Sequence, residues 1–111
     1  MEFAQNLRLS MLIDIYGPLL TSKQLQALKD YSDNDLSITE LAQISSSSRQ
    51  AVNDLLKRSI SVLEDYEAKL HLLDRQERTR DLLTSMDREL GKNNPNLACI
   101  KKNLKKIMEN L

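Results

Sequence analysis

The sequence predicts an all-α protein, and three observations support that prediction. The 111 residues include only two glycines and two prolines, so few positions interrupt regular structure. Leucine, lysine, glutamate, glutamine, alanine and arginine are abundant, and these residues favour helices. Apolar side chains also recur at helical spacing along most of the chain. The length fits one domain, or a small domain with an extension.

Two helices are expected in the first third of the chain. Residues 2–16 carry apolar side chains at helical spacing with charges between them, and Gly17-Pro18 ends this helix. Thr21 can cap a second helix over residues 22–32. The apolar stripes are formed by Phe3, Leu7, Met11, Leu12, Ile13 and Tyr16 in the first helix, and by Leu25, Leu28 and Tyr31 in the second.

Two further helices surround a run of four serines. Ser37 and Glu40 have the spacing of a capping box, which predicts a short helix over residues 38–44. Ser45–Ser48 then form a turn, and Ser48 is a suitable N-cap for a helix that begins at Arg49. This order predicts a helix-turn-helix. Its inward side chains are expected to be Leu41, Ala42, Ile44, Ala51, Val52, Leu55, Leu56 and Ile60.

The helix that begins at Arg49 meets no glycine or proline before Gly91. We nevertheless expect a bend or break near residues 72–75, because the apolar stripe fades over 74–80. Upstream of the break, Leu63, Tyr66, Leu70 and Leu73 follow the 3-4-3 spacing of a coiled-coil seam. The favoured interpretation is that this stripe packs on the first two helices. The alternative is a seam between the subunits of a homodimer.

The C-terminal part is expected to form further helix. Gly91 is suited to a helix C-terminus, and a last helix should begin near Pro95 or Asn96. We therefore divide the chain into a helix-turn-helix domain over residues 1–75 and a helical extension over 76–111, which could supply a dimer or partner surface. The last helix carries four lysines, at positions 101, 102, 105 and 106. A solvated face is the favoured interpretation, and binding to RNA phosphates, an acidic partner or a membrane surface is the alternative.

The chain has no net charge, whereas many dedicated DNA-binding proteins are clearly basic. The charge is unevenly distributed: −2 over residues 1–36, +1 over 37–58, −3 over 59–90 and +4 over 91–111. Nucleic-acid contact is therefore expected in the second helix of the helix-turn-helix or in the C-terminal tail. The acidic residues Glu64, Asp65 and Glu67 should keep their part of the long helix away from DNA.

The second helix of the helix-turn-helix has side chains that suit the major groove. In this architecture the N-terminal residues of the second helix reach base edges, where Arg pairs with guanine and Gln or Asn with adenine. Base contacts are expected from Arg49, Gln50 and Asn53. Phosphate contacts are expected from Ser48, Lys57 and Arg58, aided by free N–H groups of the first turn. Simple solvation of a polar helix face remains open on the pattern alone.

The sequence offers little for catalysis, and we expect no enzyme activity and no cofactor. The single His71 and single Cys99 lack metal-ligand spacing, and the two glycines cannot form a phosphate loop. His71 is expected to be a partly buried helix residue, and Cys99 a core or interface thiol. No apolar run approaches the roughly 20 residues needed to cross a bilayer, so no membrane insertion is expected. One cysteine and no signal-peptide pattern favour the cytoplasm.

The order of features between residues 20 and 63 resembles region 4 of bacterial sigma factors. The segments IDIYGPLLTSKQ, SRQAV, DLLKR and above all LEDYEAKLHLLD resemble more closely the YlxM-like family of small bacterial proteins, over roughly residues 2–75. This resemblance implies a sigma-like helix-turn-helix that binds DNA. It also implies a link with the signal recognition particle pathway, because the genes of the family lie beside components of that pathway.

Carried over by position, the resemblance places the reading helix at Ser48 to about Arg58. The sequence departs from the family pattern in the turn, where Ser46 and Ser47 replace a small or flexible residue and an apolar one. Ser46 is expected to adopt a left-handed conformation that a non-glycine residue resists. Ser47 removes an apolar contact worth on the order of 1 kcal/mol.

The expected function is a DNA-binding helix-turn-helix regulatory protein of the signal recognition particle pathway, acting as a homodimer. Components of that particle are candidate partners. The alternative is a protein-interaction adaptor or an RNA-binding accessory factor that uses the helix-turn-helix only as a scaffold.

Overall fold

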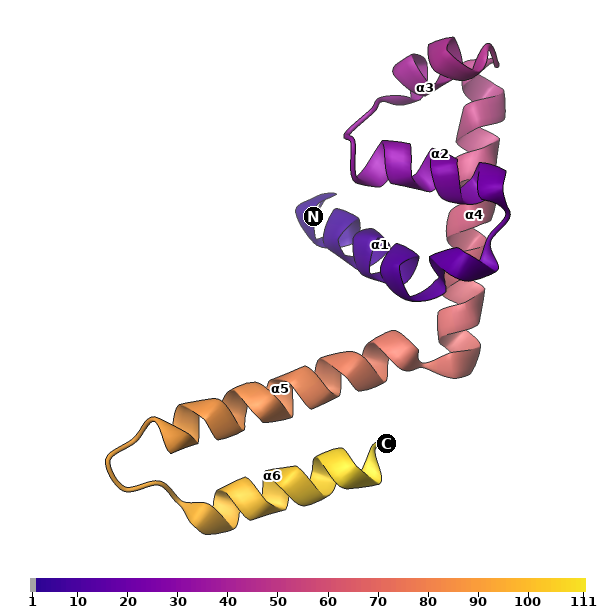
Figure 1. Cartoon of the computed structure of the whole chain (residues 1–111). Coiled ribbons are helices and arrows are strands. Elements are labelled where there is room, and N and C mark those ends of the chain that lie inside the picture. The colour runs from indigo at the N-terminus through magenta and orange to yellow at the C-terminus, as the bar shows by residue number, and fades with distance from the viewer. Residues whose placement is uncertain (1) are drawn as a thin grey trace. The chain divides into compact units, whose positions relative to one another are not determined.

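The computed structural model describes residues 2–111, with side chains from Asn6 onward. Helix α1 (Glu2–Tyr16) runs into the 3-10 turn η1 (Gly17–Leu19), and α2 (Ser22–Ser32), α3 (Ile38–Ser45) and α4 (Arg49–Leu70) follow. Helices α5 (Leu72–Leu90) and α6 (Leu97–Glu109) complete the chain (Figure 1). No strand occurs among the residues described, and the all-α prediction is confirmed.

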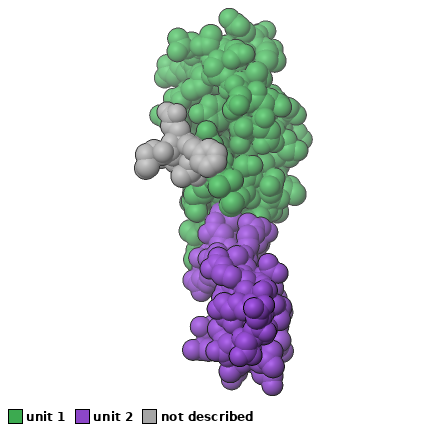
Figure 2. Space-filling model, turned by 90° about the vertical axis from the view of Figure 1, so that its left-hand side faces the viewer, with its two compact units in different colours: residues 1–71 green, residues 72–111 purple. Residues whose placement is uncertain are grey.

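The chain divides into two compact units, Met1–His71 and Leu72–Leu111 (Figure 2). Unit 1 holds α1 to α4 and unit 2 holds α5 and α6. The division lies between His71 and Leu72, a little before the boundary at residue 75 that the sequence analysis placed.

Helix α4 is the central element of unit 1, because α1, α2 and α3 all pack against it. One face of α1 supplies the apolar side chains Leu9, Leu12, Ile13 and Tyr16, spaced at i, i+3, i+4 and i+7. The core is completed from the other helices by Leu28, Leu41, Ala42, Val52, Leu56 and Leu63.

A polar pair is buried at the contact between α1 and α4. The Tyr16 hydroxyl donates a 2.6 Å hydrogen bond to Glu67 Oε1, and both side chains are buried. The Tyr16 ring also stacks on Tyr66, with ring centroids 5.8 Å apart. Glu67 is one of the three acidic residues expected to keep this part of the helix away from DNA, and its carboxylate is buried because the Tyr16 hydroxyl serves as its partner inside the core.

Several residues expected on inward stripes are exposed. Leu7 lies about 160–200° around α1 from Leu9, so it points away from the buried face. Ile44 is 68% exposed, because the eight-residue α3 buries only Leu41 and Ala42. Ala51 is exposed at the first turn of α4. Phe3 was also expected in the α1 stripe, but its side chain lies outside the described part of the structure.

The long helix breaks at His71, just before the expected interval. His71 has φ 56° and ψ 28°, and its N–H donates to the Glu67 carbonyl at 2.8 Å, so it caps α4 in the left-handed conformation. Histidine visits this conformation more readily than most residues. The prediction of a partly buried helical His71 was wrong, since the residue is exposed and outside the helices. Gly91, in contrast, does not adopt a positive φ.

The Leu63–Leu73 stripe is therefore divided between two helices. Leu63 is fully buried and Leu73 is 2% exposed, whereas Leu70 is 44% exposed. Burial of Leu63 supports the packing interpretation of this stripe over a continuous seam.

Unit 2 is an antiparallel hairpin of α5 and α6. Asn96 caps α6 by accepting the Cys99 N–H at 3.1 Å, as expected of a helix beginning near this residue. Glu89 fixes the loop, because its carboxylate accepts the Asn96 N–H at 3.0 Å and the Lys92 ammonium at 3.1 Å. These bonds hold the pKa of Glu89 below its usual range, with the backbone bond from Asn96 as the largest cause.

Candidate nucleic-acid interface

The turn between α3 and α4 is made by backbone conformation and local hydrogen bonds. Ser37 and Glu40 form the expected capping box at the start of α3. Ser46 ends α3 with φ 55° and ψ 34°, the left-handed conformation that the sequence analysis expected. The Ser47 N–H then donates to the Ala42 carbonyl at 3.0 Å. A serine therefore occupies the backbone position that glycine fills without strain.

Ser48 is the N-cap of α4, as expected. Its Oγ accepts the Ala51 N–H at 3.0 Å. The cap satisfies one donor of the first turn and leaves other N–H groups at this helix end for solvent or an anion. The start of α4 is consequently fixed at Arg49 by a bond that spans only three residues.

Four small or branched apolar side chains hold α3 against α4. Leu41, Ala42, Val52 and Leu56 are 4–6% exposed. Ala42 is the small residue in the first helix that allows the two helices to approach closely. The pair is thus packed as the helix-turn-helix prediction required, despite the serine-rich turn.

The structure gathers most of the predicted contact residues on one side of the exposed first half of α4. Ser48, Arg49, Gln50, Lys57 and Arg58 are exposed, and Asn53 is half-buried. At about 100° per residue, Arg49, Asn53, Lys57 and Gln50 span an arc of about 100°. Arg58 lies about 80° beyond Gln50, so it faces another edge of the helix.

The cationic groups of this surface are free of internal partners. No ion pair between described residues involves Arg49, Lys57 or Arg58. An acidic neighbour, Asp54, is exposed between Gln50 and Arg58 and reduces the positive potential on that edge.

Farther along α4, acidic groups are engaged inside the protein. Glu64 receives two bonds from the Arg8 guanidinium, at 3.0 and 2.8 Å, and Glu67 is buried against Tyr16. The negative charge that the sequence placed on this part of the helix is therefore partly neutralised within unit 1.

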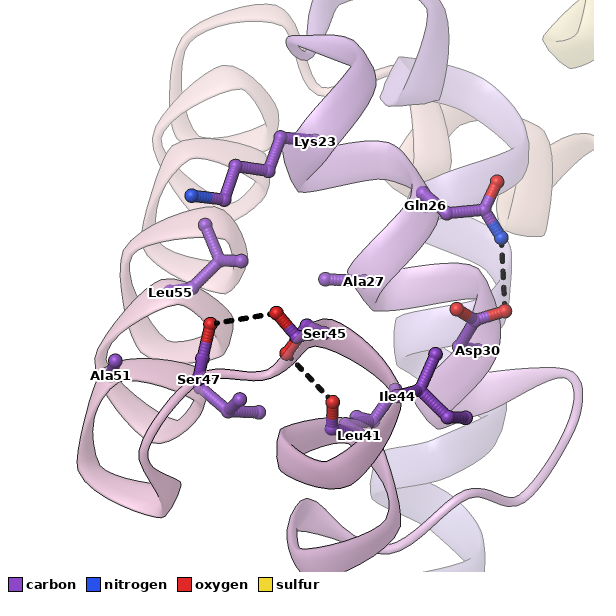
Figure 3. A pocket seen from close by; sticks show the side chains of 11 residues that line it. Lys23, Gln26, Ala27, Asp30, Leu41, Ile44, Ser45, Ser47, Ala51 and Leu55 are labelled. Carbon is purple, nitrogen blue, oxygen red and sulfur yellow. Dashed lines mark hydrogen bonds between the residues drawn. The ribbon is translucent and has the colours of Figure 1, made fainter.

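A groove beside the turn went unpredicted. It has a volume of about 330 Å³ and lies between α2, α3 and α4, with Leu41, Ile44, Val52 and Leu55 among its apolar lining residues. Figure 3 shows Lys23 reaching from α2 toward α4, and Gln26 bonded to Asp30 on another side of the groove. Ser47 also lines the groove. The signal available in the sequence was this serine, at a position where the family resemblance implies an apolar residue.

A family model described as "Putative helix-turn-helix protein, YlxM / p13 like" matches residues 3–107. The chain belongs to this family. A UPF0122 protein of Latilactobacillus sakei subsp. sakei (strain 23K) is 41% identical over 96 residues, covering 86% of this chain and 85% of the relative. A UPF0122 protein of Clostridium perfringens (strain SM101 / Type A) is 39% identical over 103 residues, covering 93% and 92%. A third, from Limosilactobacillus reuteri (strain DSM 20016), is 51% identical over 72 residues, covering 65% and 64%.

Membership of the YlxM-like family confirms the resemblance found in the sequence. The family is one of helix-turn-helix proteins and not a family of enzymes. Among the described residues, no helix is both long and apolar enough to cross a bilayer. The same part of the chain contains no cluster of three or more residues that could hold a metal ion.

Proposed function

We propose that this protein is a cytoplasmic regulatory protein that binds duplex DNA through the N-terminal half of α4 and acts as a homodimer. The observation that carries the proposal is the set of exposed cations without ion-pair partners, beside the amides of Gln50 and Asn53, on a capped helix that is packed as the second helix of a helix-turn-helix. In such proteins this helix end enters the major groove. Two copies would present two reading helices to successive faces of the groove.

The proposed contacts follow from the position of each side chain. Arg49, Gln50 and Asn53 lie on the first turns and face one way, which suits contacts to base edges. Ser48 and Lys57 flank them and suit phosphates. Arg58 points to another edge, so we assign it to a neighbouring phosphate and not to a base.

Salt-dependent DNA binding tests this proposal. Arg49→Ala and Lys57→Ala should each weaken binding to duplex DNA, and loss of a phosphate contact by Lys57→Ala should flatten the salt dependence by about one unit. The matched control is Lys69→Ala, which removes the same charge from an exposed position in the last turn of the same helix. Lys69→Ala should leave the slope unchanged.

The outcomes are distinct. If Lys57→Ala and Lys69→Ala alter the slope equally, α4 attracts DNA only through general charge, and the reading-helix proposal fails. If neither Arg49→Ala nor Lys57→Ala changes binding, the helix-turn-helix is a scaffold.

We further propose an accessory role in the signal recognition particle pathway, with its components as partners. The support is the family resemblance. The test is purification of the full chain from cells, followed by nuclease treatment and identification of what remains bound. Retention of particle protein or RNA supports this role, and its absence contradicts it without affecting the DNA-binding proposal.

The second candidate function is an adaptor or RNA-binding accessory factor. A specific observation favours considering it: unit 2 exposes both apolar side chains and four lysines that form no ion pair with described residues. Replacement of Lys101 and Lys105 by Ala should abolish partner retention if the adaptor function is correct, while Arg49→Ala should leave retention unchanged.

A further inference from the structure

Unit 2 carries a row of exposed apolar side chains along both of its helices. We call this row the hairpin strip, and its members are 43–94% exposed. They are Leu72, Leu83 and Leu90 on α5, Leu97, Leu104 and Met108 on α6, and Leu111 just beyond the end of α6. A group of exposed apolar side chains on an otherwise charged surface is typical of an interaction site.

The two halves of the strip lie on the same face of the hairpin. On α5, the half-buried residues Thr79, Leu82 and Met86 face α6, and the exposed leucines are displaced from them by about 55° around the helix. On α6, Ile100, Asn103 and Ile107 face α5, and the exposed residues of the helix are displaced from them by about 85° in the same rotational sense. Because the helices are antiparallel, rotations in the same sense bring both halves to one side.

A shallow hollow on unit 2 agrees with this placement. It has a volume of about 460 Å³, and its lining includes Leu72 and Leu83 from α5 and Leu111 just beyond α6, with Arg75 and Arg80 beside them. The other surface hollow of the hairpin is lined by the charged residues Arg78, Asp81, Lys106 and Glu109, together with Leu82 and Asn110. Exposed leucines therefore line the first hollow and not the second.

The spacing of the strip suits a helical bundle. Leu83 and Leu90 are seven residues apart, and so are Leu97, Leu104 and Leu111. A seven-residue repeat keeps an apolar stripe facing a partner helix as the helices wind around each other. The hairpin strip therefore suits a partner that presents extended helices better than a partner that inserts a single side chain.

The hairpin buries little by itself. Within residues 72–111 only Leu73 and Asn103 are buried. Units of about 40 residues usually need a disulfide, a metal or an oligomeric partner. The chain has one cysteine, and the described residues contain no metal-ligating cluster. Of the three sources of stability named above, an oligomeric partner is therefore the one that remains for the hairpin.

We propose that the hairpin strip is covered by the strip of a second copy, so that two hairpins form a four-helix bundle. Charge indicates how the copies pair. Helix α6 has four lysines against Glu109, a net charge of +3, and α5 has four arginines against five acidic residues, a net charge of −1. An arrangement with each α6 over the α5 of the other copy places opposite charges together, whereas α6 over α6 brings eight lysines together.

This arrangement predicts a specific charged contact. The bond from Asn103 to Ser85 shows which levels of α6 and α5 lie side by side, and it places Lys101 at the level of Asp87. Both side chains are exposed and flank the strip on its outer edges. A two-fold axis parallel to the helices lays Lys101 of one copy beside Asp87 of the other. Neither residue forms an ion pair with another described residue.

The composition of unit 2 favours a protein partner over a lipid surface. Residues 72–111 contain no aromatic residue, and interfacial helices usually anchor through aromatic side chains. The inference rests on the dimeric part of the proposed function and names its surface. Dimer mass can be measured without DNA, so its failure is distinguishable from a failure of DNA binding.

Light scattering on the full chain tests the inference. The wild type should have about twice the 12.8 kDa mass of one chain across a dilution series. Leu104→Asp should give the single-chain mass, because a carboxylate would be buried in the bundle. The matched control is Leu70→Asp on α4, which is similarly exposed but lies outside the strip, and it should remain dimeric.

Three results would overturn the proposal: a monomeric wild type, a dimeric Leu104→Asp variant, or a Leu70→Asp variant that alone becomes monomeric. The charge arrangement has its own test, which does not depend on the folding of Leu104→Asp. Lys101→Glu and Asp87→Lys should each weaken the dimer by about threefold to tenfold, and the double variant should restore it. Absence of restoration refutes the α6-over-α5 arrangement. Binding of the wild-type monomer to anionic vesicles, without a dimer, would assign the strip to lipid instead.

Discussion

Ser46 offers a test of how the serine-rich turn is built. It is the C-cap of α3 and holds φ at 55° and ψ at 34°. Its side chain forms no hydrogen bond with another described residue. Replacing it with glycine therefore changes the backbone preference at this position and removes no contact on which the turn depends.

The expected effect is a net stabilisation. The left-handed conformation costs a non-glycine residue about 1–2 kcal/mol. Glycine avoids that cost but loses about 0.5–1 kcal/mol more conformational freedom on folding. Ser46→Gly should therefore raise the free energy of unfolding by about 0.5–1 kcal/mol. For a domain of this size, the melting temperature should rise by roughly 2–8 °C.

Tyrosine signals allow this change to be measured in unit 1 alone. The chain has no tryptophan, and its three tyrosines all lie in unit 1, at positions 16, 31 and 66. Thermal unfolding followed by near-ultraviolet circular dichroism thus reports on the unit that contains the turn. The matched control is Ser45→Gly, one residue earlier, where the backbone is helical and Oγ donates to the Leu41 carbonyl at 2.8 Å.

The two variants should move the melting temperature in opposite directions. Ser45→Gly should lower it, because glycine within a helix costs about 0.5–1 kcal/mol. If Ser46→Gly lowers it by a similar amount, left-handed strain does not limit the turn, and the explanation given for the unusual serine is incorrect.

Two further predictions concern the buried pair and the hairpin loop. Tyr16→Phe should lower the free energy of unfolding of unit 1 by about 1.5–3 kcal/mol, because it removes the hydroxyl that donates to the Glu67 carboxylate; urea titration measures this, and an unchanged midpoint would contradict it. The lowered pKa of Glu89 stabilises the loop above the ordinary value of 4.5, and this contribution should be lost as pH falls through the lower folded value. The loss is measured as the protection of the Asn96 amide from hydrogen exchange, relative to an unstructured amide at the same pH. Glu89→Gln has no titrating group at this position, so it should abolish the pH dependence of this protection. The same pH dependence of protection in both proteins would refute the assignment.

Helix starts were predictable because their determinants are local. Thr21, Ser37, Ser48 and Asn96 each accept the backbone N–H located three residues later. A hydroxyl or amide at such a position is visible in the sequence without knowledge of the fold. The helix-turn-helix and the placement of its exposed second helix followed from these caps.

Helix ends and burial were less predictable. Both glycines follow a helix end as predicted, since α1 ends at Tyr16 and α5 at Leu90. The positive φ angles, however, occur at Asp35, Ser46 and His71 among the described non-glycine residues, and at neither glycine. Side-chain periodicity likewise could not show that Ile44 would be exposed. These properties depend on neighbouring helices, whose packing a local pattern does not specify.

The features of the candidate site were also predictable only in part. The exposure of the predicted contact residues followed from their polar character and their position on the helix. The groove beside Ser47 and the common face of the hairpin strip required the positions of separate helices, and no local pattern provides these.

The buried Tyr16–Glu67 pair also has a consequence for the alignment of α1 along α4. Apolar side chains of similar size tolerate sliding by one helical turn, since leucine can replace leucine against a neighbouring helix. A carboxylate cannot slide in this way, because a shift of about 5.4 Å would separate it from the Tyr16 hydroxyl that donates to it. The pair therefore fixes one position of α1 along α4, the helix that follows the serine-rich turn.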